Sequence, residues 1–298
     1  MTPIRYRSLA SVLREWYGRP VPKIGLDAGF GCPNRGPDGR SDAGCVYCNN
    51  ASFSSSNPAE DIQEQLQISL GQLSVSRRWA PPDGETLRAI AYFQSYSNTW
   101  AAPEILRQRY DKALAIRQIV GLAISTRPDC INPAIADLLA EYHTRTQLWI
   151  ELGLQTTSPA ALAWIRRGHD VPSFTAACNL LHERGLRTVV HLIPGLPGET
   201  AADRKSCSRL LADLAVWGIK FHHLHIVRDT PLESLAQSGT VFQPRAAEYA
   251  EMVADILHNT GTPVVHRLFS TCRPELLSPL DKSDPEIPGL MRRLFTPW

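Results

Sequence analysis

The sequence predicts an α/β protein: a partial (β/α)6 barrel of the TIM type, followed by a C-terminal extension. Three observations lead to this fold. Six short apolar runs alternate with longer amphipathic segments, several of these segments begin at proline, and polar residues cluster where the apolar runs end. Alternating strands and helices indicate a parallel sheet, which right-handed crossovers curl into a barrel. Six repeats rather than eight predict an incomplete barrel.

The apolar runs predict the strands, and the amphipathic runs between them predict the helices. Strands are expected at residues 23–26, 87–93, 120–126, 148–152, 187–193 and 219–227. Helices are expected at residues 59–75, 103–116, 133–143, 159–166 continuing at 173–184, and 201–217. Beyond residue 228 the composition changes, with a helix near 244–258, a short strand at 263–268 and a proline-rich tail.

These elements divide the chain into an N-terminal segment (1–22), the barrel (23–227) and an extension (228–298) that is expected to line or cover the substrate cavity. The N-terminal segment interleaves Arg5, Arg7 and Arg14 with Tyr6 and Trp16. This mixture is typical of surfaces that contact RNA backbone and bases, and equally of a helix with a solvated face.

The charge balance limits the kinds of partner. With 31 Lys and Arg against 29 Asp and Glu, the chain has no general attraction to nucleic acid or membranes, so any such surface must be local. No apolar run reaches the roughly 18 residues of a membrane span. We therefore expect a cytoplasmic protein without a membrane partner, in which the seven cysteines do not form disulfides.

Three of those cysteines lie in one loop. Twelve residues separate Cys32 from Cys45, and two separate Cys45 from Cys48. The intervening glycines, prolines and aspartates favour irregular backbone, which can bring three sulfurs to one point. With three thiols and no histidine before His143, a closed structural zinc site lacks its fourth ligand. An iron–sulfur cluster with one open iron, a zinc site completed from afar, and three unrelated thiols all remain open.

Polar residues follow the other predicted strands at the point where each ends. They are residues 94–99, 125–129, 151–156 and 194–199, with His222, His223 and His225 on the sixth strand. Because the carboxyl ends of parallel strands open onto one face, these side chains are expected to surround one site. This concentration predicts an enzyme rather than a scaffold.

The same segments together resemble a known family. The motifs are the cysteine loop and residues 92–99 (YFQSYSNT), 126–130 (TRPDC), 151–156 (ELGLQT), 167–169 (RGH), 195–199 (GLPGE) and 265–268 (VHRL). From about residue 5 to about 270, the chain resembles the radical S-adenosylmethionine (SAM) proteins of the YhcC-like group, which is related to the catalytic subunit of Elongator. Ser125 and the tail after Leu268 depart from that pattern.

The resemblance implies a partial barrel of the radical SAM class with a 4Fe–4S cluster at its mouth. SAM would bind the open iron through its amino and carboxylate groups. One electron from a flavodoxin-type or ferredoxin-type reductant would split SAM into methionine and a 5'-deoxyadenosyl radical, which removes a hydrogen atom from the substrate.

The resemblance also implies roles for individual residues. Cys32, Cys45 and Cys48 are expected to ligate the cluster. Contacts to SAM are expected from Gln94, Ser95, Tyr96, Ser97, Asn98, Arg127, Glu151, Gln155, Gly195 and Gly198. Structural alternatives stand beside these roles, since Arg127 could pair with Glu151, Gln155 could cap a helix, and Gly198 could belong to a simple turn.

One of the three histidines and one further cysteine are candidates for contact with the substrate, and core or surface roles stay open for His222 and His223. On a strand, His222 and His223 would point to opposite faces, whereas His223 and His225 would share one, so a triad of metal ligands is not expected. His225 is the expected substrate contact. Cys272 lies in a Ser/Thr segment after the last predicted strand and is a candidate hydrogen donor.

The resemblance favours modification of the wobble uridine of tRNA as the reaction. A small molecule or a peptide is the second substrate hypothesis. A zinc or iron–sulfur interaction module without radical chemistry is the alternative of a different class.

Overall fold

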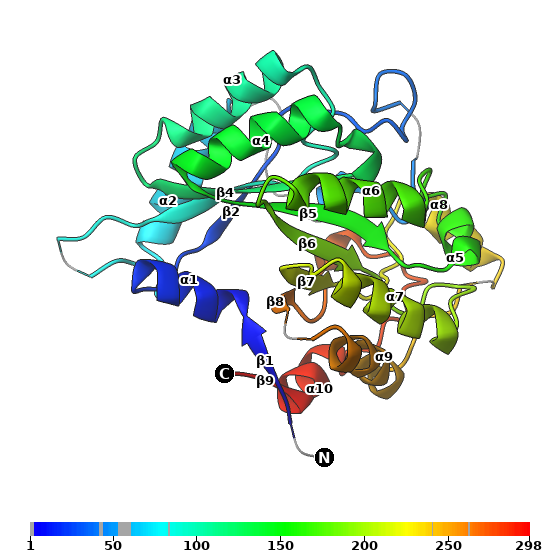
Figure 1. Cartoon of the computed structure of the whole chain (residues 1–298). Helices are drawn as coiled ribbons and strands as arrows, with labels where there is room; N and C mark the ends of the chain where they lie inside the picture. The colour runs from blue at the N-terminus through cyan, green and yellow to red at the C-terminus, as the bar shows by residue number, and fades with distance from the viewer. Residues whose placement is uncertain (1–2, 42–43, 53–60, 83, 240, 262) are drawn as a thin grey trace.

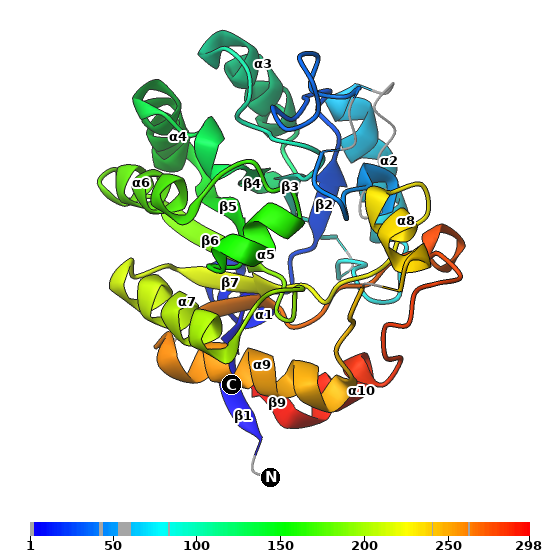
Figure 2. The same ribbon diagram turned by 90° about the vertical axis from the view of Figure 1, so that its right-hand side faces the viewer.

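One parallel sheet, with helices packed around it, forms the described part of this computed structural model. The structure describes residues 3–41, 44–52, 61–82, 84–239, 241–261 and 263–298. Figures 1 and 2 show the strands as an inner layer and most helices as an outer layer. Across the sheet, the strands are β2 (Lys23–Leu26), β3 (Ala89–Phe93), β4 (Ile119–Thr126), β5 (Gln147–Gln155), β6 (Arg187–Leu192), β7 (Gly218–Phe221), β8 (Val264–Arg267), β1 (Ile4–Ser8) and β9 (Phe295–Pro297).

Strands β2 to β7 follow chain order and confirm the predicted βα repeat. Each neighbouring pair is parallel, and every residue of β3 is buried, as expected for a strand covered on both faces. The α-helices are α1 (Leu9–Tyr17), α2 (Ile62–Ser74), α3 (Pro103–Leu114), α4 (Pro133–Arg145), α5 (Pro159–Trp164), α6 (Val171–His182), α7 (Ala201–Asp213), α8 (Pro231–Gln237), α9 (Ala246–Asn259) and α10 (Ile287–Leu294). The predicted start of the second of these, at residue 59, lies outside the described residues. No helix among the described residues is long and apolar enough to cross a membrane.

Three strands extend the sheet beyond the six predicted barrel strands. Strand β8 confirms the short strand predicted at 263–268, and β1 pairs in parallel with both β8 and β9. Strands β1 and β9 escaped prediction because β1 is only half-buried and β9 has three residues, which leaves a weak apolar signal. Residues from all three predicted regions of the chain share this sheet.

Helix α1 closes the amino-terminal end of the barrel. Its buried residues join an apolar cluster with the inward-facing residues of the strands. The ring of Trp16 stacks on Trp217 with 5.8 Å between centroids, and the Tyr17 hydroxyl donates to the carbonyl of Val120 at 2.7 Å. The helix alternative for the N-terminal segment is therefore correct. The rings of Trp16 and Tyr17 pack on the barrel, and helix α1, which carries them, lies at the end opposite the cysteine loop (Figure 1).

A single carboxylate, that of Glu151 on β5, lies fully buried inside the barrel among cations. Its Oε1 accepts from Lys23 Nζ at 2.5 Å and from Trp149 Nε1 at 3.0 Å, and its Oε2 accepts from Lys220 Nζ and His191 Nε2, both at 2.8 Å. Burial alone would raise the pKa of Glu151, but Lys220 and Lys23 hold that pKa well below its usual range. This carboxylate links β2, β5, β6 and β7 across the barrel interior.

Replacing Glu151 with Gln is expected to destabilise the protein by about 3–5 kcal/mol, because the change leaves Lys23 and Lys220 buried without their counter-ion. Urea unfolding followed by tryptophan fluorescence measures the free energy of unfolding. Glu183→Gln, which alters an exposed carboxylate, is the matched control and should change that free energy by less than about 0.5 kcal/mol. If the two variants prove equally stable, the network does not support the barrel.

Candidate functional site

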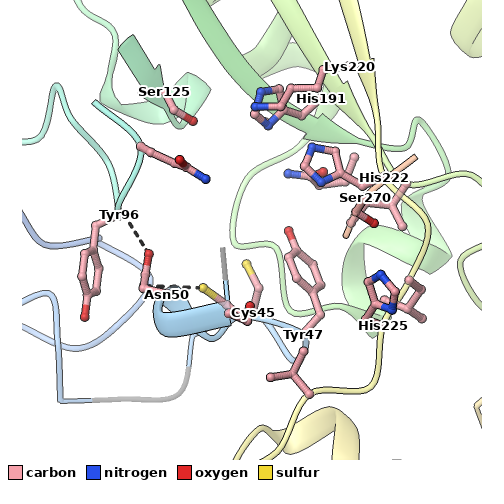
Figure 3. A pocket seen from close by; sticks show the side chains of 18 of the residues that line it. Cys45, Tyr47, Asn50, Tyr96, Ser125, His191, Lys220, His222, His225 and Ser270 are labelled. Carbon is pink, nitrogen blue, oxygen red and sulfur yellow. Dashed lines mark hydrogen bonds between the residues drawn. The ribbon is translucent and has the colours of Figure 1, made fainter. Parts of the chain in front are cut away.

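A cavity of about 210 Å³ opens at the carboxyl-terminal ends of the strands. The cysteine loop after β2, the ends of β3 to β8 and the segment after β8 form its wall (Figure 3). The predicted site residues that line it are Cys32, Cys45, Cys48, Gln94, Tyr96, Ser97, Arg127, Gln155, His225 and Cys272. In the described structure, those outside its wall are Ser95, Asn98, Glu151, Gly195 and Gly198.

Tight turns fold the cysteine loop back on itself. The N–H of Cys32 donates to the carbonyl of Gly39, and the N–H of Cys48 donates to that of Cys45, both at 2.9 Å. Gly39 has φ 71°, and a Cβ there would lie 2.1 Å from the Trp100 ring and 2.8 Å from the Cys32 nitrogen. Only glycine fits such a position, so Gly39 helps to set where Cys32 lies relative to the other two thiols.

Hydrogen-bond donors surround the sulfur of Cys45. Arg167 Nη1 and Asn34 Nδ2 each lie 3.4 Å from Cys45 Sγ. Burial would raise the pKa of Cys45, but the charge and hydrogen bond of Arg167, with smaller effects of Arg127 and Asn34, bring it below its usual value. Burial and the neighbouring thiolates raise the pKa of Cys48 to about 12. The surroundings of Cys45 thus favour its thiolate form, whereas those of Cys48 oppose it.

The donor set suits an iron–sulfur cluster. Three thiols line one cavity, and hydrogen bonds to sulfur of the kind seen at Cys45 are a feature of such clusters. In the part of the chain that the structure describes, no three His, Cys, Asp or Glu side chains are grouped as one metal ion would require. A cluster attaches its thiolates to different iron atoms, so thiols spread around a cavity fit it.

The loop after β3 is shaped by Asn98. Its Nδ2 lies 2.9–3.1 Å from three backbone carbonyls, so this side chain organises the loop, and the expected contact of this segment with SAM stays a prediction. Tyr96 has a left-handed φ of 61°, and its N–H donates to Asn50 Oδ1 at 3.0 Å. Ser95 is buried behind this turn. The turn presents Tyr96 to the cavity (Figure 3).

The guanidinium of Arg127 is held by protein groups. It donates two hydrogen bonds to Asp129, at 2.9 and 2.8 Å, and one to the carbonyl of Arg167 at 2.9 Å. Arg127 borders the cavity, and its guanidinium was expected to bind the carboxylate of SAM. In the structure this guanidinium is paired with Asp129, and not with Glu151 as in the structural alternative. The oxygens of Glu151, which was also expected to contact SAM, accept from Lys23, His191 and Lys220 inside the barrel, and the residue does not line the cavity.

Backbone strain marks Gln155 on the cavity wall. Its φ is 78°, at an irregularity in the pairing of β5 with β6, and a left-handed non-glycine residue of this kind costs about 1–3 kcal/mol and concentrates at functional sites. Gly195 and Gly198 also have positive φ, 85° each. A Cβ at Gly195 would lie 3.1 Å from Pro244, and neither glycine borders the cavity, so their expected contact with SAM stays a prediction.

The three histidines expected on the sixth strand all reach the cavity wall. Strand β7 ends at Phe221 rather than at residue 227, so the alternation of strand side chains does not apply beyond it. His222, His223 and His225 all line the cavity, which corrects the expectation that His222 and His223 point to opposite faces. The rings of His223 and His225 lie 4.1 Å apart, and His225 Nδ1 lies 3.6 Å from Asp281 of the extension.

Several cationic or titratable residues of the wall were not predicted, namely Arg35, Arg167, His191, Lys220 and Arg267. Lys220 and His191 lie in short strands that are otherwise largely apolar, and a polar residue in a buried parallel strand is the signal that points to such a role. Cys272 is half-buried on the wall, and burial raises its pKa.

Comparisons with known proteins agree with this geometry. A model of the radical SAM superfamily matches residues 29–211, and a radical SAM C-terminal domain model matches residues 216–289. Protein YhcC of Escherichia coli (strain K12) is 37% identical over 273 residues, which cover 90% of this chain and 84% of that protein. A tRNA uridine(34) acetyltransferase of Dehalococcoides mccartyi (strain CBDB1) is 30% identical over 145 residues, which cover 48% of this chain and 31% of that protein.

Among solved structures, Elp3 of the archaeon Methanocaldococcus infernus aligns with a TM-score of 0.58 and 18% identity, over 78% of this chain and 57% of that chain. This likeness concerns the fold. The superfamily match covers more than half of the chain, and the match to YhcC spans most of both proteins. The chain therefore belongs to the radical SAM superfamily, whose enzymes use a 4Fe–4S cluster and SAM.

Proposed function

We propose that Cys32, Cys45 and Cys48 ligate the 4Fe–4S cluster and leave one iron open to SAM. The carrying observation is that the three thiols and the carboxyl ends of six strands line one cavity. When bound, the cluster and SAM supply a radical that removes a hydrogen atom from the substrate. Arg167 and Asn34 donate to the Cys45 sulfur, which favours its thiolate form. The electron would come from a flavodoxin-type or ferredoxin-type reductant.

The remaining wall residues would position SAM. Tyr96 and Ser97 reach the wall from the loop after β3, next to Gln94, and Gln155 enters from β5 on strained backbone. Preorganised polar groups of this kind hold a ligand at low entropic cost. Arg127 would act indirectly, because it ties the carbonyl of Arg167 to Asp129.

Replacing Cys45 with Ala is expected to abolish cluster reconstitution, because two thiolates hold a cluster poorly. Cluster content is measured by iron and sulfide analysis after anaerobic reconstitution, and SAM cleavage by the 5'-deoxyadenosine formed with dithionite. Cys178→Ala removes a buried thiol of α6 outside the cavity and is the matched control for the loss of a thiol. Normal cluster content in Cys45→Ala would refute the ligand assignment. A wild-type protein that binds a cluster but forms no 5'-deoxyadenosine would favour an interaction module.

For the substrate, we propose the wobble uridine of a tRNA. The support is the partial similarity to a tRNA uridine(34) acetyltransferase and the fold likeness to Elp3. A small molecule is the second candidate, favoured by the basic wall of a cavity of about 210 Å³ and by the position of α1 at the opposite end of the barrel.

Deletion of the gene is expected to remove one modified uridine from the total nucleosides of tRNA, measured by liquid chromatography and mass spectrometry. Restoring the wild-type chain should return that nucleoside, whereas restoring Cys45→Ala should not. Identical nucleoside profiles with and without the gene would reject tRNA and leave a small molecule or a peptide as the substrate class.

A further inference from the structure

The described wall of the cavity is basic. It contains five cationic side chains, Arg35, Arg127, Arg167, Lys220 and Arg267, and none of its residues is Asp or Glu. A basic, largely buried wall without carboxylates leaves positive charge that a ligand must balance.

Three of these cations already face protein groups near the cysteines. Arg167 donates to Cys45, Arg127 is paired with Asp129, and Arg35 Nη1 lies 3.4 Å from the carbonyl of Cys48. These side chains offset the charge of the thiolates. The other two cations, Lys220 and Arg267, come from β7 and β8 and lie apart from the cysteine loop along the chain.

Lys220 and Arg267 are incompletely neutralised. Lys220 Nζ donates to Tyr92 Oη and to Glu151, both at 2.8 Å, but Glu151 also serves Lys23 at 2.5 Å. Among the described residues, Arg267 forms no ion pair, and its buried Nε has no hydrogen-bond partner. Lys23 and Lys220 thus share one carboxylate, and Arg267 has none in the described structure.

Neutral histidines complete this part of the wall. The guanidinium of Arg267 contacts the ring of His222, and the His222 ring lies 5.0 Å from that of His191. Burial is the main cause that lowers the pKa of His191 to about 3, so its imidazole is neutral. Figure 3 shows Lys220, His191 and His222 on the same side of the cavity, away from Cys45.

We infer that Lys220 and Arg267 bind an anionic group, a carboxylate or a phosphate, of the molecule on which the enzyme acts. This inference rests on the proposed function, because it concerns the substrate of that site. A bound anion would offset the excess positive charge, accept from Lys220, and give the Nε of Arg267 its partner. Burial, with Lys23 and Arg267 nearby, lowers the pKa of Lys220 to about 7, in accord with a site that lacks one negative charge.

The test uses the cluster-loaded, oxidised protein saturated with SAM, and it measures by isothermal titration the affinities for inorganic phosphate and for succinate. Lys220→Gln and Arg267→Gln are each expected to weaken the binding of the preferred anion at least about tenfold, because each variant loses one charge-assisted hydrogen bond. Lys205→Gln, an exposed site on α7, is the matched control and should keep the wild-type affinity. Circular dichroism shows which variants fold, and either variant alone suffices.

The outcomes separate the sources of the anion. Tighter binding of phosphate points to a phosphorylated substrate, and tighter binding of succinate points to a carboxylate. No binding of either probe to the SAM-saturated protein, or equal affinities of wild type and the folded variants, overturns the inference. The formation of 5'-deoxyadenosine is measured in the same samples. If the wild-type protein forms 5'-deoxyadenosine but the substitutions do not change the anion affinity, the anion site is refuted and the proposed function is not. If the anions bind as expected but no 5'-deoxyadenosine forms, the proposed function is refuted and the anion site is not.

Discussion

The buried carboxylate of Glu151 is the interaction on which the barrel interior depends. Its partners, Lys23, Lys220 and His191, come from three other strands, so a single side chain ties together both the early and the late parts of the sheet. A buried charge is tolerated only when its hydrogen bonds are satisfied. These contacts therefore hold the four strands in fixed positions relative to one another, and the strand ends that line the cavity are fixed with them.

The cavity has two chemical halves. Near the cysteine loop, arginines face sulfur and a backbone carbonyl, an environment that favours thiolates. On the side of β7 and β8, the positive charge of Lys220 and Arg267 is greater than the negative charge of the carboxylates near them. The first half fits a negatively charged cluster, and the second is the proposed place for an anion. The same edge of the sheet can thus hold both a cluster and an anion, because each strand end contributes a different residue.

The core of the fold was predictable because buried parallel strands carry continuous apolar runs. β2 was predicted to the residue, and the cysteine loop was expected at the cavity where it lies. Asn98 and Glu151 were expected to contact SAM because of the family resemblance; a sequence motif cannot tell whether a side chain points to a carbonyl, a buried lysine or the cavity. Lys220 and Arg267 were not predicted as site residues, because only the structure shows that both line the cavity and that Arg267 has no carboxylate partner among the described residues.

Strand β1 pairs with β8 and β9 through Val264 and Phe295, which lie far from it in the sequence. Contacts of such long sequence separation form late and slowly. The edge of the sheet at β1 is therefore expected to be completed after strands β2 to β7, which follow one another in the sequence as they do in the sheet.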